Sequence, residues 1–154
     1  MIIGVISDTH GLLRAGALAA LQGSDHIIHA GDVGGPELLA KLAALAPLSV
    51  VRGNNDRGDF AAALPTTATV QANGVSIYVI HDIAELDLDP VAGGFGVVVA
   101  GHSHQPLQQE RDGVLYFNPG SAGPRRFRLP VTVGKLTIVA GVVQGEILAL
   151  APTG

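Results

Sequence analysis

The chain has 154 residues, of which 47% are hydrophobic and 14% charged, and its formal net charge is −4. This length fits one domain over residues 1–154, and the negative charge argues against a broad nucleic-acid footprint. Cysteine is absent, which excludes disulfides, thiolate catalysis and cysteine-ligated zinc and leaves His, Asp, Glu and Asn as candidate metal ligands.

The first third of the chain predicts three repeats in which a buried strand ends at a polar cluster. Continuous apolar runs, typical of strands covered on both faces, occupy residues 2–6, 26–30 and 48–51. The spacing of apolar residues predicts helices over residues 12–21 and 37–46, the second opened by Pro36. Such repeats imply a parallel sheet with right-handed crossovers, so the three clusters should share one rim.

Beyond Pro65 the pattern changes to short β-rich segments. The dipeptides Asn73-Gly74 and Asp112-Gly113 are hairpin signals between predicted strands. The final segments, 131–140 and 142–150, are expected to pair antiparallel and close a second sheet. The remaining elements are predicted as strands at 66–71, 75–80, 96–100, 107–110 and 114–117, with a short helix at 84–88.

Polar side chains stand directly past the ends of the apolar strands. Four of the six histidines do so, namely His10, His81, His102 and His104. Open α/β sheets bind ligands at the carboxyl ends of their strands, and carboxylate with imidazole suits ions such as manganese, iron, nickel or zinc. The placement therefore predicts a metal site at that rim.

Several of these residues have a simpler interpretation. A strand-end Asp8 or Asp32 could be only a helix N-cap. His26 and His29 lie inside an apolar run and are interpreted as core or surface histidines, and Asp56 as a support for its loop.

Two later segments are equally ambiguous. Residues 118–121 could form a simple turn. The basic residues Arg125, Arg126 and Arg128 either contact a phosphate or form a solvated face.

Six motifs stand in order along the chain, namely Asp8-x-His10, Gly31-Asp32, Gly53-Asn54-Asn55-Asp56, His81, Gly101-His102-Ser103-His104 and Asn118-Pro119-Gly120-Ser121. Taken together, these motifs resemble those of the calcineurin-like metallophosphoesterase superfamily, in particular its small single-domain bacterial and archaeal phosphodiesterases. The resemblance implies a four-layer α/β/β/α sandwich and covers nearly the whole chain.

The resemblance also implies two divalent metal ions (Mn, Ni, Fe or Zn) that share Asp32. One ion would be held by Asp8, His10, Asp32 and His104, and the other by Asp32, Asn54, His81 and His102. A hydroxide bridging the ions would attack phosphorus. Asp32, Asn54 and Asn55 are then expected to be catalytic, Asn55 and Arg125 to contact substrate, and residues 118–121 to pack beside the site.

Two positions depart from the family pattern. Asn55 stands where many members have a histidine that is thought to protonate the leaving oxygen. An amide cannot be a general acid, which is typically worth about 10²–10⁴-fold, so we predict a preference for aryl or otherwise activated phosphodiesters. Asp82 follows His81 where relatives usually carry Gly, and an inward-pointing carboxylate would change metal affinity and substrate affinity in opposite directions.

The expected function is metal-dependent hydrolysis of a small phosphoester substrate. The alternatives are a nonenzymatic protein-binding scaffold of the same fold, and a phosphomonoesterase or protein phosphatase. No targeting pattern or apolar run of ~18 residues occurs, so we expect a cytoplasmic protein without a membrane partner. The apolar composition is compatible with a homodimer, although no stretch identifies an interface.

Overall fold

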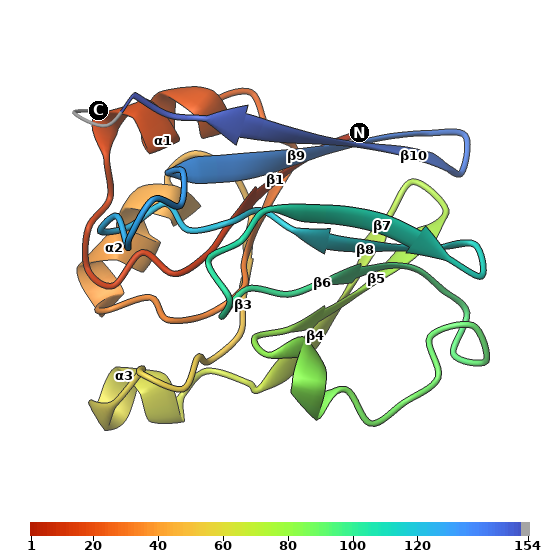
Figure 1. The fold of residues 1–154 in the computed structure, drawn as a ribbon, viewed down its shortest axis with the longest axis horizontal. Helices are drawn as coiled ribbons and strands as arrows, with labels where there is room; N and C mark the ends of the chain where they lie inside the picture. The colour runs from red at the N-terminus through yellow and green to blue at the C-terminus, as the bar shows by residue number, and fades with distance from the viewer. Residues whose placement is uncertain (152–154) are drawn as a thin grey trace.

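The computed structural model describes residues 1–151 as ten strands and four short helical elements (Figure 1). The strands are β1 (Ile2–Ile6), β2 (His26–His29), β3 (Leu48–Val50), β4 (Thr67–Ala72), β5 (Val75–Ile80), β6 (Phe95–Val99), β7 (Leu107–Arg111), β8 (Val114–Asn118), β9 (Thr132–Val139) and β10 (Val142–Ala149). The helical elements are α1 (Ala15–Leu21), α2 (Pro36–Ala43), α3 (Gly58–Ala62) and the 3₁₀ turn η1 (Ile83–Glu85).

Two mixed five-stranded sheets pack face to face. The first has the order β10-β9-β1-β2-β3, and the second has the order β4-β5-β6-β8-β7. Strands β1, β2 and β3 are parallel to one another, as are β5, β6 and β8. The predicted α/β sandwich is confirmed.

The prediction that the last two strands belong to the second sheet is wrong, because both belong to the first sheet. Strand β9 instead pairs antiparallel with β1, from Ile2 opposite Thr137 to Val5 opposite Gly134, and β10 forms the outer edge. The physical reason is that β1 would otherwise expose an unpaired edge, and β9 supplies buried Leu136 and Ile138 to the core between the sheets.

Both predicted α-helices are shorter than expected. Helix α1 begins at Ala15 rather than at residue 12, because the chain first makes a turn in which the Leu12 amide donates to the Thr9 carbonyl. Helix α2 ends at Ala43, since Pro47 disfavours helical backbone just before it. The helix predicted at 84–88 is the turn η1, and α3 was not predicted because five residues carry no periodic signal.

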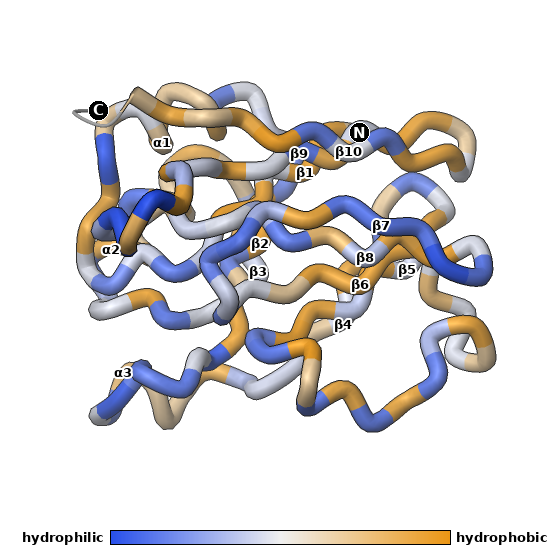
Figure 2. The backbone as a smooth tube through the Cα atoms, in the orientation of Figure 1, coloured by the Kyte–Doolittle hydropathy of each residue, from blue (hydrophilic) through white to orange (hydrophobic). Residues whose placement is uncertain are grey.

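Buried aliphatic side chains fill the space between the sheets, and Figure 2 shows hydrophobic colour along the central strands. Helices α1 and α2 cover the outer face of the first sheet through residues such as Leu21 and Leu42. On the outer face of the second sheet, Leu86 and Leu88 from the connection between β5 and β6 pack on Tyr78 and Val98. This fourth layer is thin, with η1 as its helical element among the described residues.

The carboxyl ends of β1, β2 and β3 and those of β5 and β6 meet at one side of the sandwich, where the strand-end motifs come together (Figure 1). Within residues 1–151, no helix is long and apolar enough to cross a membrane.

Candidate metal centre

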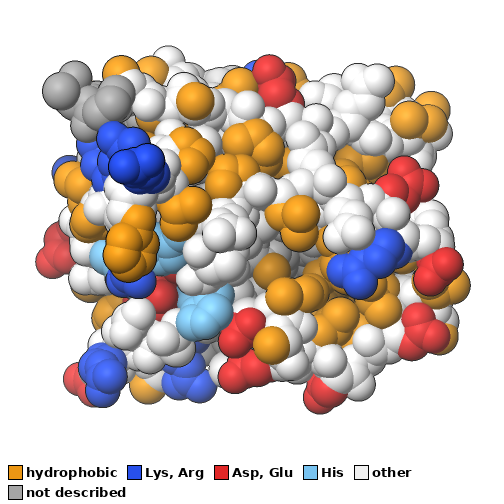
Figure 3. Space-filling view, in the orientation of Figure 1, with side chains coloured by type: hydrophobic (Ala, Val, Ile, Leu, Met, Phe, Trp, Pro, Cys, Tyr) orange, Lys and Arg blue, Asp and Glu red, His pale blue; other side chains and the backbone are white. Residues whose placement is uncertain are grey.

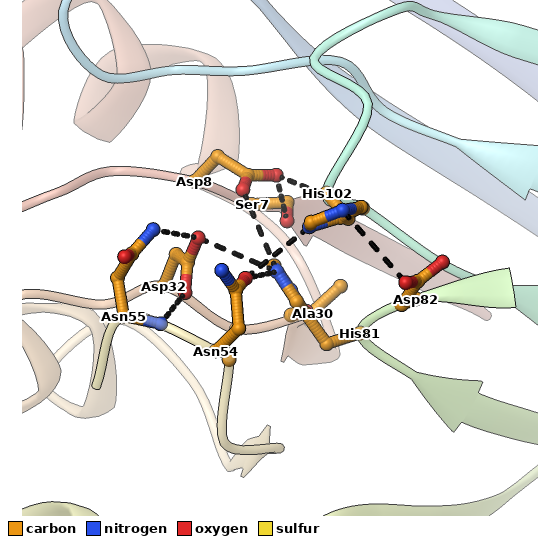
Figure 4. A network of polar contacts seen from close by, with 12 residues as sticks. Ser7, Asp8, Ala30, Asp32, Asn54, Asn55, His81, Asp82 and His102 are labelled. Carbon is orange, nitrogen blue, oxygen red and sulfur yellow. Dashed lines mark hydrogen bonds and ion pairs between the residues drawn. The ribbon is translucent and has the colours of Figure 1, made fainter. Parts of the chain in front are cut away.

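The seven predicted ligands lie in one network of contacts at this rim. Figure 4 labels five of them, namely Asp8, Asp32, Asn54, His81 and His102. The seven ligands come from five strand ends. Asp8 and His10 follow β1, Asp32 follows β2, Asn54 follows β3, His81 follows β5, and His102 and His104 follow β6.

The Asp8 carboxylate lies at the centre of the network and is fully buried. Its Oδ1 lies 3.4 Å from His104 Nε2 and 3.9 Å from the Nε2 atoms of His10 and His81. Its Oδ2 accepts hydrogen bonds from Ser7 Oγ at 2.6 Å and from the His102 amide at 3.0 Å. Three imidazoles therefore face one oxygen, while the other oxygen fixes the carboxylate.

The Asp32 carboxylate is oriented in a similar way by Asn55. The Asn55 backbone amide donates to Oδ1 at 2.8 Å, and its side-chain Nδ2 donates to Oδ2 at 3.1 Å. Oδ2 also lies 3.4 Å from His81 Nε2 and 3.7 Å from His10 Nε2. Asp32 thus stands between histidines that the resemblance assigns to different ions.

Asn54, from the loop after β3, completes the set. Its Oδ1 lies 3.0 Å from His81 Nε2 and 3.2 Å from His102 Nδ1. His81 Nδ1 lies 2.7 Å from the Ala30 carbonyl oxygen, which can only accept a hydrogen bond. This contact places the proton on Nδ1 and leaves the Nε2 lone pair directed at the centre of the site.

The donor set fits divalent cations. Among the described residues, Asp8 Oδ1, His10 Nε2 and His104 Nδ1 are buried side-chain atoms without a hydrogen-bond partner. Such atoms are costly to leave unsatisfied. Two groups, Asp8 with His10 and His104, and Asp8 with Asp32 and His81, have candidate ligand atoms within 4.8 Å of one another. Asp8 belongs to both groups, whereas the resemblance gives the shared role to Asp32.

The carboxylates are held in their charged form. Burial opposes ionisation of Asp8, but its contacts with His104, Ser7 and His81 together outweigh burial, and the pKa of Asp8 lies below its usual value. Burial likewise opposes ionisation of Asp32, yet contacts with His81 and Asn55 hold its pKa far below the usual range. Charged carboxylates are the form that binds a cation.

The pKa values of His10 and His81 are shifted in opposite directions. Burial lowers the pKa of His10, although Asp32 and Asp8 oppose the shift, so its neutral, metal-binding form is favoured. Burial also disfavours the charged form of His81, but the contacts with Asp32 and the Ala30 carbonyl prevail and raise its pKa.

Close backbone approach determines where glycine is needed. A side chain on Gly53 would collide with the Asp32 carboxylate, and one on Gly101 would collide with Ser7 and Asp8. Each glycine therefore lets one loop lie directly against a carboxylate that a neighbouring strand supplies.

The residues interpreted as structural do have structural contacts. Asp56 accepts from the backbone amides of Val33, Gly34 and Gly53 and supports the loop that carries Asn54. His29 is fully buried, with Nε2 3.0 Å from Thr9 Oγ1. His26 Nε2 lies 2.8 Å from Ser49 Oγ, away from the site.

The segment 118–121 packs beside the site, as the resemblance implies. Asn118 Nδ2 donates to the Gly101 carbonyl and to Ser103 Oγ, and Ser121 Oγ donates to the Asp8 carbonyl. These bonds tie the turn to the loops that carry Asp8 and His102.

The arginine cluster is exposed, and Figure 3 shows basic side chains close to surface histidines. Arg125 Nε donates to the Leu129 carbonyl within its own loop, so its contact with substrate stays a prediction. The charge of Arg126 acts on His10 and lowers the pKa of that histidine, after the larger effect of burial.

Sequence reasoning missed Ser7 and Arg52. Ser7 fixes the Asp8 carboxylate, and its only signal was its position directly before that aspartate. Arg52 lines a hollow of 190 Å³ together with Asn54, His81 and His102. Its place immediately before the Gly53 motif could have indicated it.

Comparison with known proteins agrees with this geometry. Residues 1–141 match the calcineurin-like phosphoesterase superfamily domain. The chain belongs to that superfamily. It is 34% identical over 160 residues to a probable metallophosphoesterase of Methanothermobacter thermautotrophicus, covering 96% of this chain and 92% of that protein.

Two solved structures share this calcineurin-like phosphoesterase fold. A novel archaeal phosphodiesterase superposes with a TM-score of 0.80 at 23% identity, covering 96% of this chain and 100% of the other. Vps29 of Entamoeba histolytica in complex with Zn²⁺ superposes with a TM-score of 0.72 at 23% identity, covering 97% and 99%.

Proposed function

We propose that this protein is a metal-dependent phosphodiesterase with two metal ions at the strand-end rim. One ion would be held by Asp8, His10, Asp32 and His104, and the other by Asp32, Asn54, His81 and His102. The proposal rests on one observation above all, namely the buried Asp8 oxygen and His10 nitrogen that lack partners and face a shared centre. Bound divalent ions would supply an activated water and neutralise phosphoryl oxygens.

The side chains present would set the charge of the centre. Two carboxylates against two divalent ions leave a net positive charge, because histidine and Asn54 are neutral ligands. A phosphodiester carries one negative charge and is attracted to such a centre. Asn55 would keep Asp32 in position through its two hydrogen bonds, and the Ala30 carbonyl would keep His81 in its ligating tautomer.

The preference for activated diesters is supported by Asn55. Its side-chain amide nitrogen donates a hydrogen bond to Asp32, and an amide is too weak an acid to transfer a proton to a leaving oxygen at neutral pH. A good leaving group such as 4-nitrophenolate needs no general acid. The archaeal neighbour described as a phosphodiesterase is consistent with this choice, although its similarity shows only the fold.

Metal stoichiometry tests the ligand assignment. Elemental analysis of manganese-loaded, desalted protein is expected to give two ions per chain for the wild type and one for His104→Ala or His81→Ala. Asp32→Asn is expected to lose both, because the shared ligand serves each ion. His26→Ala removes a histidine outside the site and should keep two ions. If Asp32→Asn kept one ion, the result would indicate that Asp8, which belongs to both groups of candidate ligands, is the ligand shared by the two ions.

Hydrolysis assays separate the proposed function from its alternatives. With manganese, bis(4-nitrophenyl) phosphate is expected to turn over faster than 4-nitrophenyl phosphate. A dominant monoester rate would indicate a phosphomonoesterase or protein phosphatase. No turnover of either ester by protein with verified metal content would favour the nonenzymatic scaffold.

A further inference from the structure

A hollow of about 130 Å³ lies on the outer face of the second sheet, beside the metal centre. It exists because the fourth layer is thin. The connection that carries Leu86 and Leu88 covers part of this face, while the part over β8 and the edge strand β7 remains open. In Figure 3, hydrophobic side chains on this face lie between a surface histidine and a basic side chain.

The walls of the hollow are predominantly apolar. Val98 and Ala100 of the β6 segment and Tyr116 of β8 contribute from the sheet. Leu107 and Ile83 stand at its rim with 46% and 42% of their surfaces exposed, so they extend the apolar wall toward solvent. An apolar ligand would cover both.

The hollow adjoins the proposed metal centre through two shared residues. Asp82 and His102 line it, and the same two residues line the 190 Å³ hollow that contains Asn54 and His81. Asp82 Oδ2 lies 3.7 Å from His102 Nε2, so the pair forms the wall between the two spaces. A substrate whose phosphoryl group lies at the metal ions could place a substituent on the other side of this wall.

The size and chemistry of the hollow favour one aromatic ring. An engineered apolar cavity of about 150 Å³ in another protein takes up a single benzene molecule, which is close to the volume here. The Arg111 guanidinium lies 4.3 Å above the Tyr116 ring and forms part of the wall, and a cation beside an aromatic occupant is favourable.

We propose that this hollow is a specificity subsite for a single-ring aromatic group attached to the phosphorus of the substrate. The inference builds on the proposed function, because it adds the substituent that the same centre selects. It assigns Leu107, Ile83 and Tyr116 to ligand contact, and no metal ligand apart from His102 takes part.

Binding of two phosphonates tests the subsite without any need for turnover. Benzylphosphonate has the size of phenyl phosphate but is not hydrolysed, and methylphosphonate lacks the ring. By calorimetry on manganese-loaded protein, benzylphosphonate is expected to bind about tenfold more tightly, as burial of most of a ring implies. The ratio should fall to about fourfold in Leu107→Ala and about twofold in Leu107→Ala with Ile83→Ala, since each removes part of the apolar wall.

The control is Val142→Ala. Val142 is an aliphatic residue that is more exposed than Leu107 and Ile83, at 63%, and it lies on β10, the edge strand of the other sheet. This variant should keep the tenfold ratio. Equal affinities for the two phosphonates in the wild type, or an unchanged ratio in the double variant, would overturn the subsite. All three substitutions are at exposed positions, and circular dichroism verifies that the variants fold.

A second measurement separates the failure of the subsite from failure of the metal centre. Phenol titrated into metal-free protein should shift the NMR amide signals of Leu107 and Tyr116 and leave that of Val142 in place. If neither phosphonate binds while phenol shifts these signals, the metal centre is refuted and the ring site stands. If phenol leaves the signals unchanged, the ring site is refuted whether or not the protein hydrolyses diesters.

Discussion

Removal of the Asp56 carboxylate is expected to destabilise the protein and to displace a proposed metal ligand at the same time. Asp56 is 8% exposed, and its Oδ1 accepts from the Val33 amide at 2.8 Å and the Gly34 amide at 3.2 Å. Its Oδ2 accepts from the Gly53 amide at 2.9 Å. One side chain therefore ties the loop after β2 to the loop that carries Asn54.

The magnitude follows from the amides that would lose their partner. Val33 and Gly53 are buried, so water cannot replace the carboxylate there, while the Gly34 amide is at an exposed residue. Two buried bonds to a charged acceptor are worth about 1.5 kcal/mol each, which gives about 3 kcal/mol for Asp56→Ala. For a chain of this size the melting temperature should fall by about 6–12 °C.

Urea unfolding followed by circular dichroism in the presence of EDTA measures this loss without a contribution from metal binding. Asp59→Ala, an exposed aspartate in the first turn of α3, is the matched control and should change stability by less than about 1 kcal/mol. Manganese affinity should also fall in Asp56→Ala, because the Asn54 loop is no longer fixed. A destabilisation within the range of the control would show that Asp56 does not support the loop.

Three further outcomes are expected. Asn55→His restores a proton donor, so the rate for methyl phenyl phosphate should rise about tenfold relative to that for methyl 4-nitrophenyl phosphate; an unchanged ratio would contradict this. Asp82→Asn removes a negative charge 3.7 Å from His102, so a higher manganese concentration should be needed for activation, while the KM for the diester should fall. If the affinities for manganese and for the diester changed in the same direction, the assigned charge effect would be refuted. Burial lowers the pKa of His29 from 6.5 to about 4, so the unfolded chain binds the extra proton between these values. The contribution of His29 to the unfolding free energy should therefore fall by about 3 kcal/mol from pH 6.5 to pH 4, so the measured loss of stability over this range should be smaller in His29→Gln than in the wild type.

The convergence of the strand-end residues was predictable because strand polarity is visible in sequence. Apolar runs that end at Asp8, Asp32 and His81 fix which end of each strand carries the polar group, and parallel pairing then brings those ends together. The residue types, aspartate and histidine, indicated metal binding, and the order and spacing of the motifs indicated the resemblance to the phosphoesterase superfamily. Neither required knowledge of the loops.

The partner of β9 was not predictable in the same way. An antiparallel pair at the end of a chain can join either sheet with the same alternation of side chains. Besides the burial of Leu136 and Ile138, contacts of Ser121 favour the first sheet: its backbone carbonyl accepts from the Thr132 amide while its side chain donates to the Asp8 carbonyl. These contacts place the chain at the edge of β1, and they are absent from any local pattern. The hollow beside His102 was equally hidden, because it results from how thinly the connection between β5 and β6 covers the second sheet.

The loop backbone shows why the site uses the residue types that it does. Positive φ angles occur at five of the proposed ligands, namely Asp8 (55°), His10 (47°), Asp32 (56°), His102 (71°) and His104 (63°). Left-handed backbone is costly for most residues, but aspartate and histidine adopt it several-fold more often than average. The residues that suit a divalent ion are thus also those that tolerate the sharp turn at a strand end.

This coincidence affects how variants of the site should be interpreted. The amide of Asp8 donates to the Gly31 carbonyl, and that of His10 donates to the Asp32 carbonyl, so each turn is fixed by backbone bonds as well as by its side chain. Alanine at these positions removes a ligand and also places a less tolerant residue at positive φ, at a cost of about 1 kcal/mol. Asparagine keeps the turn and removes the charge together with one acceptor oxygen. Asp8→Asn should therefore lose metal while it retains more stability in EDTA than Asp8→Ala, and equal stability of the two variants would show that the turn imposes no backbone requirement.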